Sequence, residues 1–331
     1  MSFFAVLFAL LAEQLKPLSN LNPIHHGLTG WVRWAGRNFD AGEDMHARVV
    51  WGITVLAPAA LTAVIYVFTN RYSTVLALGL DVAILYLTLG FRQFSHHFTD
   101  IRDALEAGRE DRARELLAHW QNLDASELPR TEILRHVLEY SLLAAHRHVF
   151  GVFFWFVALS SLGLGPAGAV LYRMAEFASR YWSYRSQITG VSTHDRLMSL
   201  SQTLFALLDH VPARLTAFGF AVVGNFEDAV DAWRRHAVLW VRPNEGTILS
   251  AASGALGVRL GGQVAPSTDG ARDVSRTITQ GDAPDVIDAQ GSTTGAAPQM
   301  AHLRSVVGLI WRSVVLWMLL LALLSLANLI G

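Results

Sequence analysis

Long uncharged runs alternate with charged segments along the chain. Residues 49–69 are an uncharged run of 21 residues, and after a short turn residues 72–91 form a second apolar run of 20 residues with a single charge. About 20 apolar residues, rising roughly 1.5 Å each in an α-helix, cross a bilayer core of roughly 30 Å. The pattern therefore predicts a membrane hairpin of two helices, with Asp81 as the only charged residue of the second.

A third run, 149–172, is also uncharged and would extend about 35 Å as one helix. Helix-weakening residues interrupt it near its middle, namely Gly163, Gly165, Pro166 and Gly168. Irregular backbone at membrane depth is tolerated where protein or a water-filled cavity surrounds it. The run is therefore either one broken crossing or a re-entrant pair of half-helices. A packing kink between neighbouring helices would use the same residues.

Further helices are predicted at both ends of the chain and in its second half. Residues 2–12 lack the basic start and the cleavage site of a signal peptide, so we expect an uncleaved helix. Residues 313–330 are uncharged and are predicted to be the last span. Residues 197–223 are amphipathic, and 246–262 form a small-residue helix suited to close packing.

Two polar segments are expected to lie outside the bilayer. Residues 98–147 have helical periodicity, and Gly108 divides their first part into a helical hairpin. Residues 263–300 are rich in Gly, Ser, Thr, Asp and Pro without any periodicity. Because such a composition buries little apolar surface, we predict a flexible loop there.

Arginines set the expected orientation. The flanks of the first hairpin carry Arg33, Arg37, Arg48 and Arg92, and the positive-inside rule places such residues in the cytoplasm. Residues 173–197 hold four more arginines. These stay on the cytoplasmic side only if the 149–172 run is re-entrant. We therefore expect a re-entrant central segment and a cytoplasmic 98–147 segment.

Composition agrees with an integral membrane protein. Of the 331 residues, 52% are hydrophobic and 16% are charged, whereas soluble domains have about 25% charged residues. The formal net charge of −1 offers no basic face for nucleic acid. The chain has no cysteine, which excludes disulfides, thiolate catalysis and Cys-based metal sites.

Together these patterns predict an all-α, polytopic membrane protein with about four transmembrane helices, a re-entrant central segment and a cytoplasmic helical layer. Residues 1–262 and 301–331 are expected to form one integral membrane domain, with the 98–147 hairpin inserted into it. The expected partner is the lipid bilayer of a bacterial-type inner membrane. A small anionic ligand, a membrane-protein partner and a homo-oligomer are further expectations.

Charged residues in or beside the apolar runs are the candidate functional residues, because each costs about 2.5–3.5 kcal/mol on insertion scales. The candidate polar pocket consists of Glu13, Asp81, Glu139, His146, Arg173, Glu176, Asp209 and Arg214. At least four of them, Glu176 aside, are expected to converge on one cavity in the cytoplasmic half of the membrane, bordered by residues 163–173. Separate pairwise salt bridges are the alternative.

The spacing of these residues along the chain indicates which pairs can bind an ion, handle a proton or form an ion pair. Glu139 and His146 lie on one face of a helix, where a carboxylate and an imidazole can bind a cation or handle a proton. The same pair would also serve as a plain helix-end network. Arg173 and Glu176 have ion-pair spacing, although the arginine could instead hold an anionic group.

Asp209 and Arg214 bracket Pro212, and a proline frees a backbone carbonyl one turn back. The histidine doublets at 25–26 and 96–97 put neighbouring rings on different helix faces, so neither doublet alone predicts a metal site. The sequence has no Walker A motif, dinucleotide-binding glycine fingerprint, HExxH or nucleophile elbow. No metal ligands or catalytic residues are assigned from such motifs.

The chain resembles the CobD/CbiB superfamily of integral membrane proteins. That family includes the adenosylcobinamide-phosphate synthase of cobalamin biosynthesis and the AmpE proteins linked to β-lactamase regulation. Four motifs carry the resemblance, in the family's order: HGLTGWVRWAGR at 26–37, GPAGAVLYR at 165–173, VPARLTAFG at 211–219 and SGALGVRLGG at 253–262. They cover most of the chain, and four in order are a strong sign of common ancestry.

The resemblance is closest to the AmpE branch, through LLAEQL, HRHVFGVFFWF, ASRYW and LLDHVPARL. Two departures from the synthase stand out. LEYSLLAAHRH replaces an AENTVDG-like motif, and an acidic pair ahead of the PARL motif is missing, where Phe205 and Ala206 stand. Apolar residues cannot replace carboxylates that hold a metal–nucleotide. Glu139 is the only nearby candidate for such a carboxylate.

The resemblance implies two functions from different classes. The first is a non-catalytic, AmpE-like sensor or regulator that binds a small ligand in the former substrate pocket. The alternative is the synthase, which would join adenosylcobyric acid to aminopropanol phosphate with ATP and Mg²⁺ as its cofactors. A transporter is a third hypothesis, but the chain has few spans and no inverted repeat.

Overall fold

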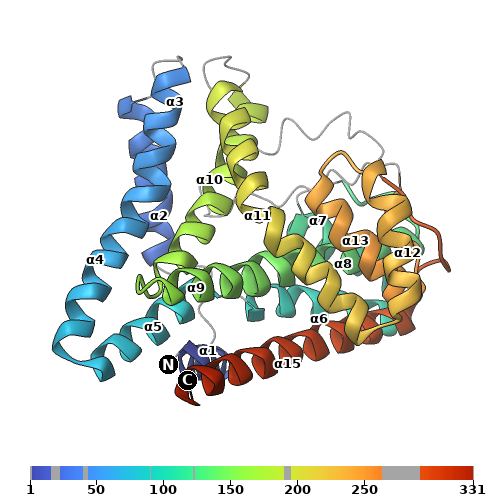
Figure 1. Cartoon of the computed structure of the whole chain (residues 1–331). Helices are drawn as coiled ribbons and strands as arrows, with labels where there is room; N and C mark the ends of the chain where they lie inside the picture. Colours follow the sequence, from blue (N-terminus) through green and yellow to red (C-terminus); the bar gives the residue numbers. More distant parts are fainter. Residues whose placement is uncertain are drawn as a thin grey trace. The chain divides into compact units, whose positions relative to one another are not determined.

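The computed structural model describes residues 2–15, 23–39, 44–89, 91–121, 124–189, 195–262 and 291–330. Helices make up nearly all of this described part, and it contains isolated β-bridges but no strand (Figure 1). The first helices are α1 (Ser2–Leu15), α2 (Pro23–Phe39), α3 (Asp44–Trp51), η1 (Gly52–Leu56), α4 (Ala57–Tyr72), α5 (Thr74–Thr88), α6 (Phe91–Glu106) and α7 (Glu110–Gln121). The others are α8 (Arg130–Ala145), η2 (His146–Phe150), α9 (Gly151–Ser161), α10 (Ala167–Thr189), α11 (Asp195–Val223), α12 (Phe226–His236), η4 (Ala237–Leu239), α13 (Pro243–Leu256) and α15 (Met300–Ile330). The all-α prediction is confirmed.

The helices divide into two compact units. The first unit is built mainly from Met1–Gln93 and Arg147–Leu208, and the second mainly from Phe94–His146, Asp209–Gly270 and Asp285–Gly331. Each unit therefore combines distant parts of the sequence. The division falls inside continuous helical stretches, so α11 contributes its first half to one unit and its second half to the other.

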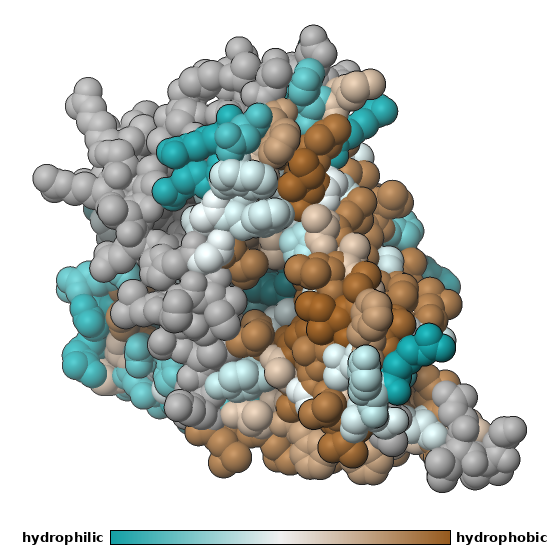
Figure 2. Space-filling model, turned by 90° about the vertical axis from the view of Figure 1, so that its left-hand side faces the viewer, coloured by the Kyte–Doolittle hydropathy of each residue, from teal (hydrophilic) through white to brown (hydrophobic). Residues whose placement is uncertain are grey.

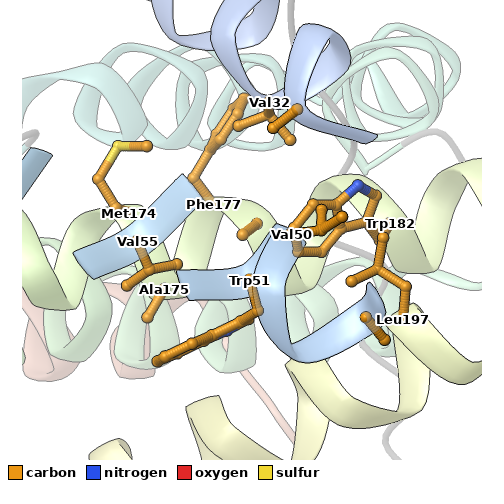
Figure 3. Packing of buried hydrophobic residues seen from close by; sticks show 12 residues of the cluster. Val32, Val50, Trp51, Val55, Met174, Ala175, Phe177, Trp182 and Leu197 are labelled. Carbon is orange, nitrogen blue, oxygen red and sulfur yellow. The ribbon is translucent and has the colours of Figure 1, made fainter. Parts of the chain in front are cut away.

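A hydrophobic cluster joins α2, α3, α10 and α11 within the first unit (Figure 3). Val32 comes from α2, Val50 and Trp51 from α3, Phe177 from α10 and Leu197 from α11. All of these side chains are buried. Burial of each large apolar side chain stabilises the fold by about 1.5–3 kcal/mol. The cluster explains why the polar segment after α1 is helical, since α2 buries the apolar side chains of one face in it.

The predicted membrane hairpin is formed by α4 and α5. Ser73 separates the two helices: its backbone is extended, and its hydroxyl oxygen accepts a hydrogen bond from the N–H of Leu76. Large apolar side chains of α4, such as Leu61, Val64 and Phe68, are exposed. Figure 2 shows a broad band of hydrophobic residues on the face turned to the viewer, which is the face toward which α4 is drawn in Figure 1. Such a surface fits contact with lipid.

Four helical stretches of the described residues are long and apolar enough to cross a membrane: Met45–Tyr72, Arg130–Ser161, Arg196–Val223 and Met300–Ala327. This number agrees with the prediction of about four spans, but the identity of the spans differs in part. The second hairpin helix, α5, has 15 residues and rises only about 22 Å. Arg196–Val223, which the sequence predicted to be amphipathic, is long and apolar enough to span instead.

The central run 149–172 is interrupted where the sequence predicted. Helix α9 ends at Ser161 and α10 begins at Ala167. Gly163 and Gly165 in the turn have φ values of 77° and 57°, which glycine adopts at no steric cost. The chain therefore makes a tight turn here, and α9 and α10 pack against each other as a helical hairpin. Because α9 continues α8 and η2 in one stretch, Arg130–Ser161, that is long enough to cross a membrane, re-entry of the central segment stays a prediction.

Two glycines of the GPAG sequence bring backbone and side chains into close contact around this turn. A side chain at Gly168 would collide with the backbone carbonyl of Trp155, so only glycine lets α10 approach α9 this closely. Gly165 lies against the ring of Tyr66 from α4 in the same way. The GPAG sequence therefore fixes the turn and packs it onto the membrane hairpin.

The second unit is organised around α8. Most side chains of α8 are buried, and the helix packs against α7, α13 and α15. Helices α12 and α13 also form a close pair, because a side chain at Gly254 would collide with the backbone carbonyl of Asp228. The small-residue helix predicted at 246–262 is therefore present and closely packed, but it ends at Leu256, and residues 258–262 are not helical. Asn225 caps α12 by accepting a hydrogen bond from the N–H of Asp228.

Helix α13 ends at Gly257, whose φ is 65°. The chain then pairs with the segment before α15 through two isolated bridges, Val258–Ala296 and Gly261–Ser292. Most of the predicted flexible loop, residues 263–290, lies outside the described residues. Its last part is described and forms the other side of this paired segment.

Candidate functional site

His146 connects two other buried side chains in the second unit. Its Nε2 lies 2.7 Å from Asp209 Oδ1, and its Nδ1 lies 2.8 Å from Thr216 Oγ1. All three side chains are buried. Because a carboxylate only accepts hydrogen bonds, Nε2 carries the hydrogen. In the neutral ring Nδ1 then accepts the hydroxyl hydrogen of Thr216. A carboxylate, an imidazole and a hydroxyl that are hydrogen-bonded in this order can pass a proton from one to the next.

Helix positions bring these three groups together. His146 begins the π-helical segment η2 that follows α8, whereas Asp209 and Thr216 are seven residues apart on one face of α11. Pro212 lies between them and has no N–H to give to the carbonyl of Leu208. The indole nitrogen of Trp155 donates a hydrogen bond to that carbonyl at 3.1 Å. The predicted freed carbonyl is therefore present and is bound by a tryptophan.

A second buried network surrounds Glu139. Both of its carboxylate oxygens lie near Arg135 Nη1, at 3.1 and 3.3 Å, and one of them accepts a hydrogen bond from the N–H of Gly261 at 2.6 Å. Arg135 Nε donates to Glu132 at 2.8 Å. Arg135 is 3% exposed and Glu139 is fully buried. Breaking such a buried pair typically costs about 3–5 kcal/mol.

This network fixes the SGALGVRLGG motif to α8. Gly261 has a φ of 81°, and a side chain there would collide with the carbonyl of Gly291. Thr293 adds a further tie, because its hydroxyl lies 2.7 Å from that of Ser253 and accepts a hydrogen bond from the N–H of Leu260 at 2.8 Å. The glycines and hydroxyls of the motif are thus used to hold the backbone beside the Arg135–Glu139 pair.

Arg214 is a cation held by neutral groups. Its Nη1 donates to the carbonyl of His210 at 2.8 Å and to Asn244 Oδ1 at 3.4 Å. Asn244 lies at the start of α13. No ion pair of Arg214 is found among the residues that the structure describes. Its charge is therefore available to an anionic ligand.

Two candidate residues of the first unit form an ion-pair network on α10. Glu176 is 2% exposed and lies 3.0 Å from Arg173 Nη1 and 3.2 Å from Arg180 Nε. This confirms the ion-pair spacing of Arg173 and Glu176. Arg180 completes the network and was not a candidate, although its i, i+4 distance from Glu176 is a spacing that predicts pairing.

The remaining two candidates, Glu13 and Asp81, are buried in the first unit on α1 and α5, which pack against each other. The Oδ1 atom of Asp81 has no hydrogen-bond partner. Four of the eight candidates thus lie in the first unit, and four lie in the second. The structure joins His146 to Asp209 and Arg173 to Glu176. Convergence of at least four charges on one cavity stays a prediction.

Sequence reasoning missed Thr216, Arg135 and Asn244. Arg135 precedes Glu139 by four residues, a spacing that could have identified it.

No group of three or more His, Asp or Glu side chains placed to hold a metal ion occurs in the described part of the chain. A pocket of the first unit is lined by Val32, Arg33, Gly36, Arg37, Tyr181, Trp182 and Leu197, and includes none of the candidates.

Comparison with known proteins identifies the family. The family model described as CobD/Cbib protein matches residues 6–289, a range that contains all eight candidate residues. The chain belongs to the CobD/CbiB family. This agrees with the resemblance carried by the four sequence motifs.

The curated relatives that match this chain carry two different names. "Cobalamin biosynthesis protein CobD" of Stutzerimonas stutzeri (strain A1501) is 31% identical over 242 residues, covering 73% of this chain and 71% of the relative. The protein of that name from Chromobacterium violaceum is 32% identical over 265 residues, covering 78% and 82%. "Protein AmpE" of Shigella flexneri is 26% identical over 243 residues, covering 70% and 78%. No solved structure matches this family member.

Proposed function

We propose that this protein acts in cobalamin biosynthesis as a membrane-bound synthase that joins adenosylcobyric acid to aminopropanol phosphate through an amide bond. The similarity to two relatives named for cobalamin biosynthesis, each covering more than 70% of this chain, is the observation that carries the proposal. The more distant AmpE relative gives weaker support to the regulatory alternative. We further propose the inner membrane as the location.

The side chains of the second unit suit the polar steps of such a reaction. An amine attacks only after it has lost its proton, and His146, held by Asp209, is a base that can accept one. The phosphate of aminopropanol phosphate needs a cation, and Arg214 has only neutral partners in the described residues. In this proposal His146 is the proton acceptor and Arg214 is the phosphate ligand.

The resemblance to the synthase also implies ATP and Mg²⁺. Mg²⁺ bound with a nucleotide usually takes one or two protein carboxylates. The buried carboxylates of the second unit that were candidates are already engaged, Glu139 by Arg135 and Asp209 by His146. Glu139 and Asp209 therefore do not form a preformed Mg²⁺ site, and no step of the proposed reaction is assigned to the metal.

Complementation tests the proposal. A bacterial strain that lacks its own synthase and grows only when it makes cobalamin should grow when it carries this chain. His146→Ala and Arg214→Ala should abolish that growth, whereas Thr203→Val, on the exposed face of α11, should not. Immunoblots of the membrane fraction show that each variant is present. Absence of growth with a well-expressed wild-type chain would contradict the synthase function.

The second candidate function is a non-catalytic, AmpE-like membrane protein that binds a small anionic ligand. One observation favours it: His146, Arg147 and His148 stand where the resemblance leads one to expect an acidic AENTVDG-like motif. Deletion of the gene in its own host distinguishes the two. Loss of cobalamin-dependent growth supports the synthase, whereas normal growth with altered β-lactamase expression supports the regulator.

A further inference from the structure

Buried carboxylates of this protein are paired with cations almost wherever their contacts are seen. Glu139 is bound by Arg135, and Asp209 by His146. Glu176 lies between two arginines in the first unit. Pairing of this kind offsets the large cost of removing a carboxylate from water. Against this background, a buried acid without an ion pair to a side-chain cation is a specific feature of the molecule.

Asp81 is such an acid. Its side chain is 3% exposed, and Oδ1 is buried with no hydrogen-bond partner. No ion pair of Asp81 occurs among the residues that the structure describes. It lies in the middle of α5, on the same buried face as Ala77 and Leu85, one turn before and one turn after it. The immediate helix face is therefore aliphatic.

The elements packed against α5 supply few groups that could neutralise this charge. Helix α1 carries the buried acid Glu13, and the amino terminus of the chain, which precedes α1, is a positive group that interacts electrostatically with Asp81. Helix α4 carries Arg71, exposed at the turn of the hairpin, and Tyr66, the phenol that interacts electrostatically with Asp81. Helix α10 carries Arg173 and Arg180, and both contact Glu176.

A metal cation is a poor occupant for this position. Alkali and divalent ions need several oxygen ligands, whereas α5 is a regular helix whose interior carbonyls bind its own N–H groups. No cluster of three acidic or histidine side chains surrounds Asp81 in the described part of the chain. A proton needs only one carboxylate oxygen. It converts the most expensive buried group of the hairpin into a neutral one.

We propose that Asp81 is a proton-binding site in the membrane hairpin, where the carboxyl group is held as the neutral acid and exchanges its proton. The inference rests on the burial and contacts of Asp81 and does not depend on the proposed synthase function. It assigns Asp81 a role distinct from that of Glu176, which is equally buried in the same unit but ionic.

The neutral acid has a characteristic reaction. A lipid-soluble carbodiimide such as dicyclohexylcarbodiimide takes the carboxyl proton onto one of its nitrogens, while the carboxylate oxygen bonds to its central carbon. The O-acylisourea so formed rearranges by transfer of the acyl group from oxygen to nitrogen, giving a stable N-acylurea. All atoms of both reactants are retained. A carboxylate that is ion-paired with arginine has no proton to supply for the first step.

The experiment treats the full-length protein in lipid vesicles with dicyclohexylcarbodiimide and maps the modified residue by mass spectrometry. We expect modification at Asp81 and at least ten-fold less at Glu176, the matched buried carboxylate. Modification should increase as the pH is lowered, and Na⁺ or K⁺ should not protect. Asp81→Asn should remove the modified peptide and leave the protein folded, since an amide is neutral and similar in shape.

Two outcomes would overturn the proposal. Protection of Asp81 by Na⁺ or K⁺ would show that the site holds a metal cation. If no modification is found, a second measurement, which needs no reagent, shows whether Asp81 is protonated. The infrared C=O band of a protonated carboxyl group is separate from the bands of a carboxylate. A wild-type minus Asp81→Asn difference spectrum that lacks this band at neutral pH would show that Asp81 is ionised.

Discussion

The hydroxyl of Thr216 behaves differently from most other hydroxyls on these helices. The hydroxyls of Ser141, Ser201 and Thr203 each donate to the backbone carbonyl four residues earlier in their own helix. Thr216 lies instead 2.8 Å from the imidazole of His146, in another helix. Its hydrogen bond therefore ties α11 to η2 and fixes the orientation of a buried imidazole ring.

Substitution of Thr216 measures that tie. Thr216→Val keeps the shape but removes the hydroxyl, which leaves His146 Nδ1 buried without this partner, at a cost of about 1–3 kcal/mol. We expect a lower midpoint of thermal unfolding in detergent and weaker complementation. Thr216→Ser should restore both. Thr203→Val is the matched control on the same helix, because its hydroxyl is exposed. Equal midpoints for Thr216→Val and Thr203→Val would refute the role of this hydrogen bond.

At this scale the sequence identified charges but not their neutral partners. His146 and Asp209 were candidates because charge is expensive beside apolar runs. Thr216 gave no such signal, since an uncharged threonine in an apolar helix is ordinary. Seventy residues separate it from His146, and no local spacing rule reaches that far. Arg135, at i, i+4 from Glu139, is the partner that a spacing rule does predict.

At the scale of elements, the α9–α10 hairpin depends on one glycine. A Cβ atom at Gly168 would meet the backbone carbonyl of Trp155, which cannot move without shifting α9. Gly168→Ala should therefore lower the unfolding midpoint or prevent folding, although alanine normally favours a helix by roughly 0.5–1 kcal/mol over glycine. Gly308→Ala in α15 is the control, because nothing lies within 4 Å of its added Cβ. A Gly168→Ala protein as stable as Gly308→Ala would show that the two helices are not closely packed.

Element boundaries could be predicted where backbone chemistry marks them. Gly163 and Gly165 identified the central break, and Gly108 the turn after α6. The two π-helical segments found in the described part of the chain, Gly52–Leu56 and His146–Phe150, have no sequence signal of this kind. Nor did hydropathy show that α5 would end at Thr88, because the apolar run continues beyond it. Such details depend on packing against neighbouring helices.

At the scale of the whole molecule, the distribution of arginines predicts one orientation in the membrane. The residues at both ends of the α4–α5 hairpin and the α6–α7 segment should be cytoplasmic, and the tip of the hairpin should face the other side. Ala107 and Asn70 are exposed positions that report on these two places. The chain has no cysteine, so a single introduced thiol is the only one.

We expect Ala107→Cys to react with a membrane-impermeant maleimide only after the cells are opened, and Asn70→Cys to react in intact cells. Each variant is the control for the other, since both positions are exposed: Ala107 lies in the turn after α6, and Asn70 lies in the last turn of α4. Labelling is read on the purified protein after quenching. Reaction of Ala107→Cys in intact cells, with Asn70→Cys protected, would invert the orientation. It would also remove the charge argument for a re-entrant central segment, because the arginines after Arg173 would then lie outside together with those of the first hairpin.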